Sequence, residues 1–166
     1  MEPQKREIRG KDIYLYIIFS VGLTLVCNSA VTGIFKILNI HPTHYQINDP
    51  PIEILTVAFP FIMFLAALTE EIFFRLPLAL LAKIKVPKRG ILTCALVLSI
   101  IFGYCHGGSY YIFIQGVSGV ILSMLFLECG GYQGKIIKPI MVSATAHFLF
   151  NGVIAISLLI RGVAHF

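Results

Sequence analysis

The chain has 166 residues, of which 57% are hydrophobic and only 13% are charged, and its mean hydropathy is +0.87. A soluble domain of this size needs more polar surface, so the composition excludes a water-soluble globular protein and indicates a membrane protein. The formal net charge of +5 comes from basic residues that flank apolar stretches, which indicates membrane topology and not nucleic-acid binding.

Five apolar stretches follow one another, and each is long enough, or nearly so, to cross about 30 Å of hydrocarbon as an α-helix. They span residues 13–35, 52–82, 91–105, 111–127 and 139–160. The third and fourth are the shortest, and the turn-forming residues Gly107, Gly108 and Ser109 join them. The sequence therefore predicts an all-α, polytopic transmembrane helix bundle with about five crossings. We expect residues 1–166 to form a single transmembrane domain with a motif-bearing core at about 52–160.

Lysine and arginine residues alternate between dense and sparse connections. Four precede the first stretch, none lies at 39–51, four follow the second stretch, none lies at 106–110, two follow the fourth stretch and one lies near the end. Under the positive-inside rule, this alternation predicts a cytoplasmic N-terminus and five crossings. We therefore expect an integral, multi-pass protein of a bacterial plasma membrane. Its expected partners include membrane lipids, anionic ones among them.

The middle of the second stretch carries three charged residues, Glu70, Glu71 and Arg75. A charged side chain at the bilayer centre costs about 2.5–3.5 kcal/mol on insertion scales, so a cluster of three indicates function. Residues four apart share a helix face, which pairs Glu71 with Arg75. Glu70 points about 100° away from that pair. It is therefore the candidate catalytic carboxylate and general base.

Two later stretches each carry a histidine. His106 follows Phe102 by four residues at the end of the third stretch, and His147 shares a helix face with Asn151 in the fifth. At about 1.5 Å per residue, Glu70 and both histidines reach the middle third of the bilayer. We therefore expect one buried cavity that holds Glu70, His106, His147 and Asn151. In it, His106 shares a proton or orients a water molecule, and the Asn151 amide donates to an oxyanion.

In this order on successive apolar segments, the patterns E-E-x-x-x-R, F-x-x-x-H and H-x-x-x-N resemble those of the CPBP family. That family comprises CAAX-processing type II endopeptidases and bacteriocin-processing or immunity proteins, and the resemblance covers about residues 54–155. It implies an intramembrane protease, usually described as glutamic, without a cofactor and with a peptide or prenylated-protein substrate. By resemblance, Glu70 and His106 activate water, and His147 and Asn151 stabilise the oxyanion. The supporting residues would be Glu71, Arg75 and Phe102.

Three other interpretations stay open. Glu70, His106 and His147 are also a plausible Zn²⁺ ligand set that leaves one position for water. The segment Gly116-Val-Ser118-Gly119 matches the G-x-S-G pattern of rhomboid proteases, with His147 as the base. Small residues at such positions also favour close helix packing. Finally, a bacteriocin immunity or membrane-interaction protein would use the same pocket without turnover.

Overall fold

The computed structural model describes residues 10–40 and 58–163, and every regular element within these ranges is helical. The all-α prediction is confirmed for this part of the chain. In a membrane, a continuous apolar segment satisfies all its backbone hydrogen bonds internally only as a helix or in a closed barrel. The first residues of the second predicted stretch, 52–57, lie outside the described residues.

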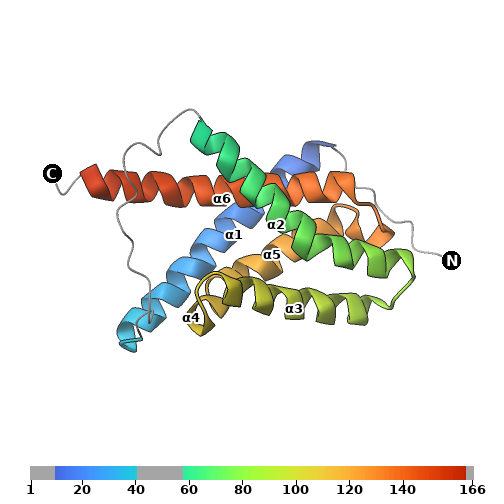
Figure 1. Ribbon diagram of the computed structural model, residues 1–166, viewed down its shortest axis with the longest axis horizontal. Coiled ribbons are helices and arrows are strands. Elements are labelled where there is room, and N and C mark those ends of the chain that lie inside the picture. The colour runs from blue at the N-terminus through green and yellow to red at the C-terminus, as the bar shows by residue number, and fades with distance from the viewer. Residues whose placement is uncertain (1–9, 41–57, 164–166) are drawn as a thin grey trace.

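The described ranges contain five long α-helices, one single-turn helix and one 3₁₀ turn (Figure 1). In chain order they are α1 (Gly10–Ile37), α2 (Ala58–Lys83), α3 (Lys88–Cys105), α4 (Ser109–Ile112), α5 (Gln115–Glu128), η2 (Gly131–Gln133) and α6 (Ile137–Val163). The long helices follow the predicted stretches closely. The fourth stretch differs, because it is divided between α4 and α5 at residues 113–114.

Four helical segments of the described chain are long and apolar enough to cross a membrane. They are Asp12–Ile37, Lys88–Cys105, Ser109–Glu128 and Ile137–Ile160. α2 is 26 residues long, but Glu70, Glu71 and Arg75 interrupt its apolar sequence. The chain is therefore a multi-pass membrane protein, while a fifth crossing by α2 and the orientation stay predictions.

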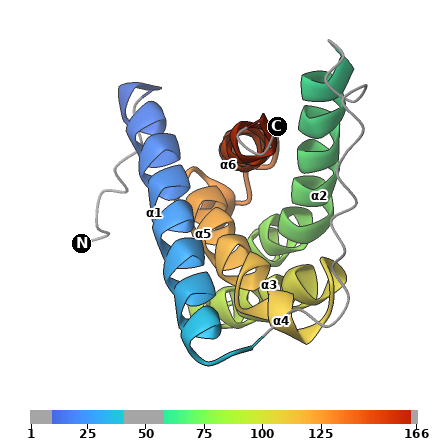
Figure 2. The same cartoon turned by 90° about the vertical axis from the view of Figure 1, so that its left-hand side faces the viewer.

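The helices that carry the polar motifs pack together. α2 packs against both α6 and α3, and α5 contacts α1, α3 and α6. Figure 2 shows α1 and α2 on opposite sides of α6. One hydrophobic cluster, which includes Leu78, Ile91 and Phe126, joins α2, α3, α5 and α6, and a second joins α1 to α5 and α6. This packing brings α3 and α6 alongside the charged middle of α2.

The turn after α3 determines where His106 lies. His106 is the C-cap residue of α3. Gly107 and Gly108, which follow it, have φ angles of 142° and 87°, a conformation that residues with a side chain rarely adopt. These two glycines therefore let the chain leave α3 directly after His106, and the predicted turn is present.

Candidate active site

The middle of α2 holds a buried ion pair. Arg75 Nε lies 3.1 Å from Glu71 Oε2, and Arg75 Nη2 donates to Glu71 Oε1 at 3.3 Å. Both side chains have 0% exposure. Their spacing of four residues places them on one face of the helix. Because breaking such a pair leaves an uncompensated buried charge, the pairing explains how α2 accommodates two of the three charges in its middle.

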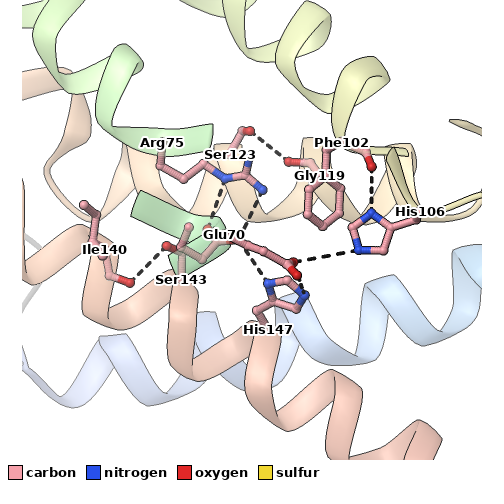
Figure 3. Close-up of polar contacts among 10 residues, drawn as sticks. Glu70, Arg75, Phe102, His106, Gly119, Ser123, Ile140, Ser143 and His147 are labelled. Atoms are coloured by element: carbon pink, nitrogen blue, oxygen red, sulfur yellow. Dashed lines mark hydrogen bonds and ion pairs between the residues drawn. The ribbon is translucent and has the colours of Figure 1, made fainter. Parts of the chain in front are cut away.

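Glu70 lies apart from this pair and faces two histidines from other helices (Figure 3). Its Oε2 lies 3.7 Å from His147 Nε2 on α6 and 3.8 Å from His106 Nε2 at the end of α3. The Glu70 side chain is 37% exposed and that of His106 29%, whereas His147 is only 3% exposed. Glu70 Oε2 itself is buried and makes no direct hydrogen bond within the described structure. Three groups capable of acid–base chemistry therefore converge, and the cluster is open on the side of Glu70 and His106.

In each histidine, the contact made by Nδ1 determines which ring nitrogen carries the hydrogen when the ring is neutral. His106 Nδ1 lies 2.7 Å from the Phe102 carbonyl oxygen, which can only accept, so Nδ1 carries the hydrogen. His147 Nδ1 lies 3.2 Å from Glu71 Oε1, and an ionised carboxylate also only accepts. When either ring is neutral, its Nε2 lone pair therefore faces Glu70. Glu71 thus contacts both Arg75 and His147, a link between α2 and α6 that the sequence did not indicate.

Phe102 packs against most of the site. Its ring centroid lies 4.4 Å from that of His106 and 5.8 Å from that of His147. The Cζ atom of Arg75 lies 5.7 Å from the same centroid, and Phe74 makes an edge contact at 5.1 Å. The sequence pattern connected Phe102 with His106 alone. The structure adds that this one fully buried ring holds both histidines and the arginine in place.

Glycines allow α5 to approach Phe102 and α3 closely. A Cβ atom on Gly119 would lie 3.2 Å from Phe102 Cδ1 and 3.2 Å from Ser99 Cα. A Cβ atom on Gly103 would lie 2.7 Å from the backbone nitrogen of Gly116. This is the close helix contact that small residues permit. Packing therefore accounts for the glycines of the G-x-S-G segment.

Ser118 makes hydrogen bonds that do not involve His147. Its hydroxyl accepts from Asn28 Nδ2 of α1 at 3.1 Å and donates to the Ile114 carbonyl at 3.2 Å. The His147 ring contacts Glu70 and Glu71. Among the described residues, no Ser118–His147 hydrogen bond supports the serine hypothesis.

Asn151 lies one turn beyond His147 on α6 and is partly buried. Among the described contacts, none joins its amide to Glu70 or to either histidine. The expected four-residue cavity is thus a cluster of Glu70, His106 and His147, with Asn151 one helical turn away.

The same cluster contains atoms that could bind a metal. Glu70 supplies a carboxylate oxygen, and His106 and His147 each present Nε2 while Nδ1 is held by a carbonyl or carboxylate, as in many zinc sites. However, no group of three or more His, Cys, Asp or Glu side chains in the described ranges has the spacing of a metal site. The donor atoms suit zinc, but their spacing does not correspond to a preformed metal centre.

Comparison with known proteins agrees with the resemblance noted from the motifs. The model of a family described as type II CAAX prenyl endopeptidase, Rce1-like, matches residues 52–153. This range covers more than half of the chain and includes all three polar motifs. No curated protein and no solved structure matches the chain.

Proposed function

The chain belongs to the Rce1-like family of type II CAAX prenyl endopeptidases, and on this basis we propose that it is a glutamate-dependent intramembrane endopeptidase. Family membership implies a protease, and the arrangement of the buried side chains supports the catalytic type. The observation that carries the proposal is the position of Glu70 Oε2, which faces Nε2 of both His106 and His147.

Glu70 acts as the general base. Its distances of 3.7 and 3.8 Å to the two histidine nitrogens are too long for direct hydrogen bonds. Polar groups at such separations can be bridged by one water molecule. A water between Glu70 and His106 gives a proton to Glu70 Oε2 while its oxygen attacks the substrate carbonyl carbon. His106 orients this water through Nε2, because its Nδ1–H is held by the Phe102 carbonyl.

His147 and Asn151 stabilise the oxyanion that the attack creates. His147 Nδ1 donates to Glu71, and when Nε2 also carries a hydrogen it can donate to the oxyanion. Asn151, one turn further along α6, supplies an amide N–H donor of oxyanion-hole type. Glu71 and Arg75 act as positioning residues, since they hold His147 without contact to the substrate.

Collapse of the tetrahedral intermediate breaks the C–N bond of the peptide. The proton held by Glu70 passes to the leaving nitrogen, and Glu70 returns to its ionised form. The net reaction adds one water molecule across the peptide bond. We infer a substrate bond near or within the membrane, in a CAAX-type tail of a prenylated protein or in a leader-like peptide.

Quantitative proteomics of native membranes tests this function. Membranes with wild-type protein are compared with membranes that contain Glu70→Gln, and the substrate is expected to accumulate uncleaved in the variant. Thr69→Ala is a matched control, because Thr69 neighbours Glu70 but its hydroxyl donates to the Leu65 carbonyl. If no membrane protein differs between wild type and Glu70→Gln, a binding or immunity function without turnover replaces the proposal.

Kinetics on a peptide that spans the cleavage site then test the residue roles. His106→Ala and His147→Ala should each lower kcat/KM on the order of 10²-fold or more, as general-base and oxyanion deletions do. Asn151→Ala should lower kcat/KM by a similar factor if the Asn151 amide donates to the oxyanion. Activity should persist after exhaustive chelation, whereas loss to a chelator and recovery with Zn²⁺ would favour a zinc-dependent protease.

A further inference from the structure

A basic surface lies where α2 ends and α3 and α6 begin. Six exposed side chains form it, and together they are called the basic rim: Lys83, Lys85, Lys88, Arg89, Lys135 and Lys138. These helix ends lie at the opposite end of α3 from α4 (Figure 1). Because the residues come from two separate connections, it is the fold that concentrates their charge.

Direct contacts join the two connections into one surface. A Cβ atom on Gly134 would lie 2.7 Å from Lys83 Cγ, so Lys83 packs against the turn that precedes α6. Lys88 Nζ lies 5.1 Å from the ring centroid of Tyr132 in η2. Below them, the first turns of α3 and α6 contribute Ile91 and Ile140 to the same hydrophobic cluster. These contacts hold the two connections side by side.

The chain supplies little negative charge to this surface. After Glu71, the only acidic residue in the sequence is Glu128. Neither α3 nor α6 has an acidic residue in its first turn, where carboxylates usually offset the positive end of the helix dipole. Lys88 and Arg89 occupy the first turn of α3, and Lys138 that of α6. An external anion would offset this excess of positive charge.

Exposed apolar side chains border the basic rim. Ile84, between Lys83 and Lys85, is 73% exposed, and Ile137, next to Lys138, is 79% exposed. A nucleic acid, or a peptide with acidic side chains alone, would leave these side chains in water. A phospholipid instead offers its anionic headgroup to the lysines and its acyl chains to the isoleucines. We propose that the basic rim binds the headgroups of anionic phospholipids, a property that is independent of the proposed protease activity.

The full-length protein in lipid nanodiscs provides the test. Phosphatidylcholine discs are compared with discs that contain increasing phosphatidylglycerol, and the melting temperature and the retained lipids, measured by native mass spectrometry, are recorded. Phosphatidylglycerol should raise the melting temperature and be retained selectively. A variant with four glutamines, at Lys83, Lys88, Arg89 and Lys138, should bind it about 600-fold more weakly, because each of the four cations near a membrane surface contributes roughly fivefold.

Two variants control for the loss of charge and for folding. Lys36→Gln removes one exposed lysine from the last turn of α1, at the opposite end of the bundle from the basic rim. Its neighbour Phe35 contacts Tyr110 of α4 there. Lys36→Gln should weaken phosphatidylglycerol binding by no more than roughly fivefold, far less than the four glutamines do. Arginine at Lys83, Lys88 and Lys138 keeps the charge and should retain the response even if the glutamine variant folds poorly.

Three results would overturn the proposal. An equal phosphatidylglycerol response in wild type and in a folded glutamine variant would show that the basic rim does not bind the lipid. The same stabilisation by inorganic phosphate alone would show a general anion effect. Binding of an acidic peptide without any phosphatidylglycerol effect would indicate a protein partner instead.

Discussion

Glu71→Gln tests whether the buried pair supports the fold. Both side chains of the pair have 0% exposure, and the Arg75 guanidinium lies within 3.1 and 3.3 Å of the Glu71 oxygens. Glutamine has the same shape as glutamate but no charge, so Arg75 would keep a buried charge without its counterion. Removing one member of a buried pair costs about 3–5 kcal/mol. Since 1.4 kcal/mol is a factor of ten, the unfolded fraction should rise by more than roughly 10².

Thermal unfolding of the purified protein measures this effect. At about 2–4 °C per kcal/mol for a chain of this size, Glu71→Gln should lower the melting temperature by about 6–20 °C. Glu70→Gln should change it by a few degrees at most, because Glu70 is 37% exposed and lies outside the pair. The double variant Glu71→Gln/Arg75→Met removes both charges and should recover most of the lost stability. Its activity should stay low, because His147 Nδ1 no longer faces a carboxylate.

Two melting-temperature results would refute this reasoning. If Glu70→Gln lowers the melting temperature as much as Glu71→Gln does, the buried pair is not what supports the fold. If the double variant is less stable than Glu71→Gln, the uncompensated charge of Arg75 is not the cause of the loss.

Three further outcomes concern packing, mechanism and topology. Gly103→Ala should lower the melting temperature, because its Cβ would lie 2.7 Å from the backbone of α5, whereas Gly22→Ala, with nothing within 4 Å, should be neutral or stabilising by up to about 1 kcal/mol. Ser118→Ala should keep most of the protease activity, and its loss in a stable protein would favour a serine mechanism. In a cysteine-free background, a reagent applied from outside should label Ser109→Cys but not Lys88→Cys. Labelling of Lys88→Cys but not of Ser109→Cys would show that the chain has the opposite orientation in the membrane.

The length and order of the apolar stretches predicted most of the helices. The division between α4 and α5 could not be predicted in this way, because the dividing residues, Phe113 and Ile114, are themselves apolar. Next to the division, α4 contacts α3 closely. A Cβ atom on Gly103 would lie 2.7 Å from Ile112 Cα and 2.8 Å from the Tyr111 carbonyl oxygen. α4 thus lies directly on the backbone of α3. A hydrophobicity pattern records which residues avoid water, but it does not record where two helices touch.

Helical spacing also predicted part of the site. It paired Glu71 with Arg75 and separated Glu70 from them, since these relations lie within one helix. The contact of His147 with both Glu70 and Glu71 depends on the rotation and tilt of α6 against α2, which spacing along the chain does not give.

This contact changes how a mutation at Glu71 must be interpreted. Because the imidazole of His147 lies between the two carboxylates, the structural pair and the candidate base are physically coupled. Removing the Glu71 carboxylate would remove the partner of His147 Nδ1 as well as the counterion of Arg75. Loss of activity in Glu71→Gln alone would therefore not identify Glu71 as a catalytic residue. The double variant with Arg75→Met separates the two effects, because it restores the stability without restoring the carboxylate that holds His147.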